Sequence, residues 1–100
     1  MTVHMVRFTA TPEAAEDVEK GVATLFAAVQ EARPAGTRFR YYREADGVSF
    51  VALLELHEGI DNPLPTIPAA RDFQASLPTW AITPPTPEPL TLLASYDSAA

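Results

Sequence analysis

The 100-residue sequence has no cysteine and few basic side chains. The absence of cysteine excludes disulfides, thiol catalysis and cysteine metal sites. Seven basic against thirteen acidic residues give a formal net charge of −6 at pH 7, which argues against a surface for nucleic acid or anionic membranes. No apolar run approaches the roughly 20 residues that span a bilayer, and the N-terminus does not resemble a signal peptide. We therefore expect a cytoplasmic protein that binds neither nucleic acid nor membranes.

Apolar residues make up 47% of the chain, which is typical of a globular fold. This length suits one domain, so we expect residues 1–100 to form a single domain with 97–100 as a tail. Eight of the ten prolines lie between Pro63 and Pro89. Regular elements are therefore expected mainly before this segment, because proline interrupts helices and inner strands.

Residues 2–9 are rich in β-branched and aromatic side chains, which predicts a strand. Thr11 is expected to cap the helix that follows, with Pro12 in its first position. Apolar residues then recur at three- and four-residue spacing over 18–29, as on one face of an amphipathic helix. The Pro-Ala-Gly sequence at 34–36 ends this helix.

A hairpin is expected next. Residues 37–44 alternate between polar and aromatic side chains, and 48–56 form a nearly continuous apolar run. The Asp46-Gly47 dipeptide between them tolerates the backbone conformation of a tight turn.

The last third of the chain is predicted to hold a second helix and a last strand. Pro68 can open a helix that Pro78 ends. The four prolines within 84–89 leave little freedom for a helix or an inner strand. The apolar segment Leu90–Tyr96 is therefore expected to be the last strand.

The element order β-α-β-β-α-β predicts an α+β ferredoxin-like fold: a four-stranded antiparallel sheet with two helices on one face. Right-handed crossovers place the first and third strands in the middle. The run 48–56 is apolar on both faces, because Val51 and Leu53 alternate with Phe50, Ala52 and Leu54. Two helices cover one face only, so we expect a second copy to cover the other, as a homodimer through the sheet face.

This order of elements, with the opening strand 2–9, the double-faced third strand and an apolar last strand, resembles the dimeric α/β-barrel superfamily. The resemblance is to antibiotic-biosynthesis-monooxygenase-like domains in particular, and it covers nearly the whole chain. It implies a cofactor-independent monooxygenase acting on an aromatic or quinol-type small molecule, with no cofactor and no metal. Haem-degrading relatives need a histidine on the second helix, and residues 68–77 contain none.

Four residues are the candidate catalytic groups. His4 lies mid-strand and could act as a general base, or could be a structural histidine. Arg40 and Tyr42 share a strand face and could clamp a phenolate, or could protect an edge strand. Trp80 could line an aromatic pocket or pack over the end of the barrel. Asn62, before a proline, is expected to be a turn or helix-cap residue rather than a catalytic group.

An alternative function is a non-catalytic dimer of the same fold that binds a small molecule or serves a structural role. A structural role predicts a collapsed cavity, whereas ligand sites usually exceed about 300 Å³. An isomerase or decarboxylase on this scaffold is a third interpretation, because the fold does not determine the chemistry. His57, Glu58 and Asp61 are expected to form a surface loop rather than a metal site.

Overall fold

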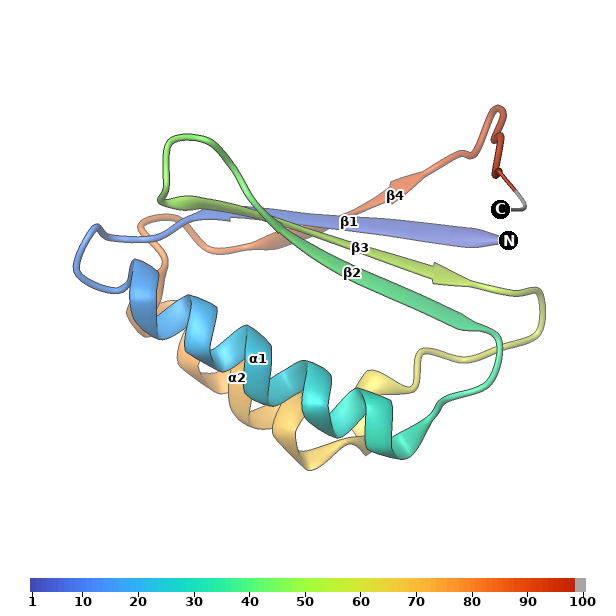
Figure 1. Ribbon diagram of the computed structural model, residues 1–100, viewed down its shortest axis with the longest axis horizontal. Coiled ribbons are helices and arrows are strands. Elements are labelled where there is room, and N and C mark those ends of the chain that lie inside the picture. The colour runs from blue at the N-terminus through green and yellow to red at the C-terminus, as the bar shows by residue number, and fades with distance from the viewer. Residues whose placement is uncertain (99–100) are drawn as a thin grey trace.

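Two helices lie against one face of a four-stranded antiparallel sheet, as the sequence predicts (Figure 1). The computed structural model describes residues 1–98, so the last two positions of the expected tail at 97–100 lie outside the described residues. The elements are β1 (Thr2–Thr9), α1 (Ala15–Ala32), β2 (Thr37–Arg43), β3 (Ser49–Leu56), a short 3-10 helix (Leu64–Thr66), α2 (Pro68–Trp80) and β4 (Thr86–Leu90). None of the helices described is long and apolar enough to cross a membrane.

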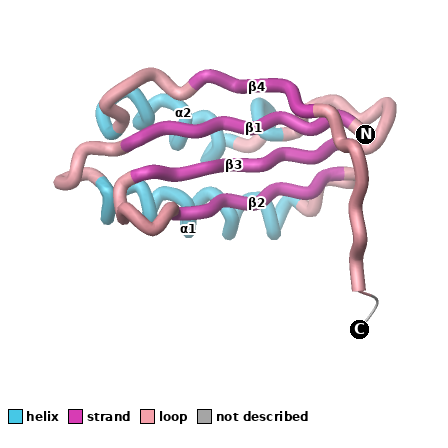
Figure 2. Tube along the Cα trace, turned by 90° about the horizontal axis from the view of Figure 1, so that it is seen from above, coloured by secondary structure: helices cyan, strands magenta, loops and turns pink. Residues whose placement is uncertain are grey.

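The strand order is β2-β3-β1-β4, which confirms that the first and third strands are central (Figure 2). The register pairs Phe8 of β1 with Phe50 of β3 and Phe39 of β2 with Leu54 of β3. These side chains therefore share the face that the helices cover. We call this the helix face and the opposite one the far face.

The first helix begins later than predicted, at Ala15 rather than Pro12. Thr11 is therefore not the cap of this helix: the capping position is Ala14, whose side chain forms no capping hydrogen bond. The backbone carbonyl and the side-chain oxygen of Thr11 both accept the N–H of Ala14, at 3.0 and 3.3 Å. That contact closes a separate turn, and the helical pattern starts where Val18 donates to the carbonyl of Ala14 at 2.9 Å. At the other end, Arg33 adopts a left-handed conformation with φ of 48°.

The second helix begins at Pro68 as predicted but passes through Pro78, where the sequence predicts its end. A proline removes one helical hydrogen bond. The helix nevertheless continues to Trp80, and at its end the N–H of Ala81 donates to the carbonyl of Leu77 at 2.8 Å. The two helices approach closely at Gly21, where an added Cβ would lie 3.0 Å from the Trp80 ring.

The last strand is the main correction. The sequence predicts it over Leu90–Tyr96, whereas β4 comprises Thr86–Leu90 and lies within the proline-rich run. An edge strand turns only every second residue's N–H toward its neighbour, so Pro87 and Pro89 fit at the outward-facing positions. Segment 91–98 has no regular structure and is exposed. It leaves the sheet on the far-face side (Figure 1).

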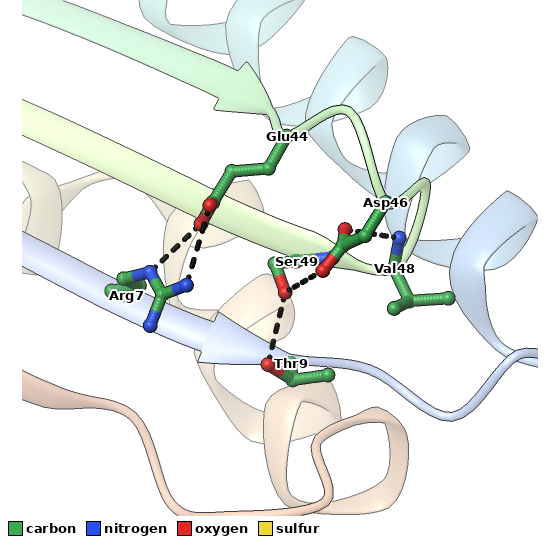
Figure 3. Close-up of polar contacts among 6 residues, drawn as sticks. All are labelled: Arg7, Thr9, Glu44, Asp46, Val48 and Ser49. Atoms are coloured by element: carbon green, nitrogen blue, oxygen red, sulfur yellow. Dashed lines mark hydrogen bonds and ion pairs between the residues drawn. The ribbon is translucent and has the colours of Figure 1, made fainter.

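The hairpin turn is organised by the Asp46 carboxylate (Figure 3). It accepts hydrogen bonds from the N–H groups of Val48 and Ser49 at 3.0 and 2.8 Å, and from the Ser49 hydroxyl at 2.7 Å. These bonds, led by that of the hydroxyl, lower the pKa of Asp46. The buried Ser49 hydroxyl also contacts the Thr9 hydroxyl at 3.0 Å, which ties the turn to β1.

Aromatic rings fill much of the layer between sheet and helices. Phe8 and Phe50 stack across β1 and β3 with ring centroids 5.5 Å apart. Phe26 of α1 stacks on Phe39 at 4.9 Å. The main buried cluster consists of Phe8, Ala10, Val18, Leu25, Phe50, Ile67, Ala70, Phe73 and Leu77. This cluster holds both helices against the central strands.

A candidate small-molecule cavity

A cavity of about 520 Å³ lies between the helix face of the sheet and α2. The strands contribute His4, Val6, Phe39, Tyr41, Ala52, Leu54 and Pro87, whereas α1, the loop before α2 and α2 itself contribute Leu25, Asn62, Leu64, Pro65, Ala70, Arg71, Phe73, Gln74 and Leu77. Most of these side chains are apolar. The exposed ones among them are Asn62, Pro65, Arg71, Gln74 and Pro87, so we assign these five to the mouth of the cavity.

The cavity exists because the residues along one part of the layer are small. Ala52 of β3 and Ala70 of α2 are buried and contribute only a methyl group each. Larger rings bound the cavity: Tyr41 meets Phe73 edge to face with centroids 5.7 Å apart. The space left open is therefore apolar and bordered by aromatic rings, which suits a planar apolar ligand.

His4 is the predicted site residue that lines this cavity. It is half-buried on the central strand β1, where it pairs with Leu54 of β3 and Pro89 of β4. Because side chains alternate along a strand, Val6 and Phe8 share its face. The imidazole can thus reach a molecule bound against the sheet.

Arg40 and Tyr42 lie on the far face, away from the cavity. Arg40 donates to Glu55 of β3 at 3.2 Å, and Tyr42 is exposed. Their neighbours Phe39 and Tyr41 point the other way and line the cavity. In this chain the structure therefore separates Arg40 and Tyr42 from His4 by the thickness of the sheet.

Trp80 lies at the end of α2, where its ring packs on Phe73 with centroids 5.7 Å apart. It also fills the space beside Gly21 of α1. Within residues 1–98 it is not among the side chains that line the cavity. Its observed contacts are those of a packing residue between the helices.

Asn62 and Tyr41 also line the cavity, and neither is one of the four catalytic candidates predicted from the sequence. Asn62 forms the expected turn, because its Oδ1 accepts the N–H of Leu64 at 3.0 Å, and it also lies at the cavity mouth. Tyr41 is half-buried, and burial raises the pKa of its phenol above the ordinary value. The alternation of residues 37–44 could have shown that Tyr41, rather than Tyr42, faces the core.

Metal ligands do not gather in the part of the chain that the structure describes. Among residues 1–98, no three histidine, aspartate or glutamate side chains come close enough together to hold a metal ion. His57 and Glu58 are exposed in the loop after β3.

A scan against protein-family models and a search of curated proteins both found no match. Solved structures do match. A candidate antibiotic biosynthesis monooxygenase from Nitrosomonas europaea superposes with a TM-score of 0.79 at 16% identity, over 94% of this chain and 100% of that one. SnoaB, a cofactor-independent oxygenase from Streptomyces nogalater, in a variant with an asparagine replaced by alanine, gives 0.71 at 20% identity, over 97% of both chains. A second Nitrosomonas europaea protein, of unknown function, superposes with a TM-score of 0.75 at 19% identity, over 99% of this chain and 95% of that one.

These similarities confirm the predicted resemblance at the level of the fold. The chain has the ferredoxin-like fold of antibiotic-biosynthesis-monooxygenase-like proteins, matched over almost its full length. Proteins with one fold can carry out unrelated reactions, so the function has to be argued from the cavity.

Proposed function

We propose that this protein binds a small aromatic molecule of the quinol or anthrone type in the cavity and oxygenates it without a cofactor. The cavity itself carries the proposal: its volume of about 520 Å³ exceeds the roughly 300 Å³ at which ligand sites begin. Its apolar walls suit fused aromatic rings, and His4 lies at its edge. The fold shared with a cofactor-independent oxygenase supports the same reaction class.

The reaction balances without an external reductant. An anthrone CH₂ group loses a proton to His4, and the resulting carbanion transfers its electrons to O₂. One oxygen atom becomes the new ring carbonyl, and the other leaves as water with the two hydrogens of the CH₂ group. The Tyr41 phenol is protonated at neutral pH, because the ordinary tyrosine pKa is about 10 and burial raises the pKa of Tyr41 further, so it can donate a hydrogen bond to the enolate oxygen that forms.

Dithranol, an anthrone, is a suitable probe for this reaction. We expect the protein to accelerate its oxygen uptake, and His4→Ala to lower the rate about 100-fold or more, the usual contribution of a general base. His57→Ala, in an exposed loop, is the matched control and should leave the rate unchanged. An oxygen electrode gives the rate, and the quinone absorbance gives the product. Uptake no faster than in buffer, or full activity in His4→Ala, would contradict the proposal.

A non-catalytic binding protein is the second candidate. The largely apolar lining favours it, because binding needs only shape and burial of apolar surface. Ala52→Leu should fill part of the cavity and weaken binding of anthraquinone, measured by ligand fluorescence. If wild type binds anthraquinone, Ala52→Leu abolishes the binding and no oxygen uptake is accelerated, the protein is a non-catalytic binding protein rather than a monooxygenase.

We also propose that two copies pair through the far face. That face presents the half-buried side chains of Met5, Val51 and Leu53, bordered by ion pairs such as Arg7–Glu44 at 2.8 Å. The C-terminal segment on the same side adds apolar surface, because Leu93 is 93% exposed. Figures 1 and 2 show this segment leaving β4 and running past the end of the sheet where β1 begins. A second copy could bury both surfaces at once.

Light scattering at micromolar concentration tests this pairing. We expect twice the chain mass of 10.8 kDa, and a return to the monomer mass in Leu53→Glu because the new carboxylate would be desolvated in the interface. Thr24→Glu, on the exposed surface of α1, is the control and should remain dimeric. A wild-type particle of monomer mass would refute the pairing.

A further inference from the structure

The arginines of this chain divide into those with an acidic partner and those without one. Four of the six, all in the sheet, form ion pairs: Arg7 with Glu44, Arg38 and Arg40 with Glu55, and Arg43 with Glu16 and Glu19. Arg71 forms no ion pair within the described residues. It is also the cationic side chain that lines the cavity.

Arg71 lies near the start of α2, and Gln74 follows one turn later. Residues three apart share a helix face, and both side chains are exposed at the mouth of the cavity. The first turn of α2 has no acidic residue, whereas that of α1 has Glu16 and Asp17. Among residues 1–98, the Arg71 guanidinium at this mouth has no acidic side chain within ion-pair distance, on a chain of formal net charge −6.

We propose that the cavity binds an aromatic carboxylate, with the fused rings inside and the carboxylate paired with Arg71 at the mouth. This inference rests on the proposed function, because it assigns the polar end of the same ligand. A guanidinium presents two parallel N–H donors to a carboxylate. The amide of Gln74 can add a third donor, while the rings contact the apolar interior near Ala70 and Phe73.

A matched pair of ligands isolates the carboxylate. Anthraquinone-2-carboxylate and 2-(hydroxymethyl)anthraquinone share their ring system and differ in charge. We expect Arg71→Gln to weaken binding of the carboxylate about tenfold, in line with a charge-assisted hydrogen bond at a partly exposed site, and to change binding of the alcohol less than twofold. Arg71→Lys should recover part of the loss. Titration calorimetry measures all of these affinities.

Lys20→Gln is the charge-matched control, because Lys20 is exposed on α1 and does not line the cavity. It should change neither affinity. Added NaCl should reduce the preference for the carboxylate, since salt screens exposed charges. If wild type binds both ligands equally and Arg71→Gln changes neither affinity, the role of Arg71 is overturned. The cavity would then remain a binding site. Failure of both ligands to bind wild type would overturn the proposed function as well.

Discussion

The two faces of the sheet are made by the same strands yet carry different chemistry. The helix face holds the stacked Phe8 and Phe50 and other large apolar side chains. The far face mixes half-buried Val51 and Leu53 with the ion pairs of Glu55. Since adjacent residues of a strand point to opposite faces, neighbours such as Phe50 and Val51 belong to different environments. The helix face holds the buried core and the cavity, and the far face is the surface through which we propose that two copies pair.

The layer between the helix face and the helices is filled more completely beside α1 than beside α2. Beside α1, the Phe26 and Phe39 rings stack at 4.9 Å and fill the layer. Toward α2, Ala52 and Ala70 are too small to fill it, and the cavity lies there. The layer thus stays hollow where small residues border an otherwise well-packed region.

The largest effect on stability is expected from Phe50→Ala. Phe50 is 2% exposed and stacks on Phe8, so its truncation should cost about 3–5 kcal/mol of unfolding free energy. Val51→Ala, the next residue but on the far face, is the control and should cost clearly less. Urea denaturation measures both. Equal losses would show that the two faces do not differ as the structure indicates.

A second prediction concerns alkaline pH. Because burial raises the pKa of Tyr41 in the folded state, the unfolded chain ionises first, near the ordinary tyrosine value of about 10. Stability should therefore be intact below that pH and fall as pH rises above it. Tyr41→Phe removes this loss, so its stability should decline less steeply between pH 9 and about 11. Parallel declines in thermal melts would contradict the buried position of Tyr41.

Asp46 in the hairpin turn should make the stability of the fold depend on pH in the opposite direction. Hydrogen bonds from Ser49 and Val48 lower the pKa of Asp46 in the folded state. The ionised Asp46 carboxylate therefore stabilises the fold above the ordinary aspartate pKa of about 4, and this stabilisation is lost as the pH falls below that value. Asp46→Asn should lower the melting temperature at pH 7, and the difference from wild type should shrink at acid pH. A difference that is constant with pH would argue against the carboxylate's role.

The smallest effect is expected from Glu55→Gln on the far face. Glu55 forms ion pairs with Arg38 at 3.6 Å and with Arg40 at 3.2 Å. Both arginine side chains are about half exposed. Exposed ion pairs contribute little and are screened by salt. The loss measured in urea should be well below that of Phe50→Ala and smaller still at high salt. A large loss that salt leaves unchanged would contradict this view of the far face.

Much of the fold was predictable because its signals are local. The alternation over 37–44 and the Asp46-Gly47 turn predict the hairpin, and the element order predicts the topology, which the strand order confirms. The last strand lies earlier than the predicted Leu90–Tyr96, because the prolines disfavour a helix or an inner strand but not an edge strand. Pro87 and Pro89 are accommodated at an edge, and an edge position depends on the assembled sheet.

The site was less predictable. His4 could be selected as a chemically capable residue on an apolar strand face. Its separation from Arg40 and Tyr42 follows from which face of β2 meets the helices, and the cavity is bordered by Ala52 of β3 and Ala70 of α2. The approach of β3 and α2 around the cavity joins distant segments, and no short pattern in the sequence encodes it.

By itself the sequence determined the identity and order of most elements, since periodicity, capping and turn chemistry act between near neighbours. Only the tertiary structure decided which residues form β4, where the layer stays hollow and which side chains surround that space. These features depend on contacts between segments far apart in the chain, which form only when the sheet and helices pack together.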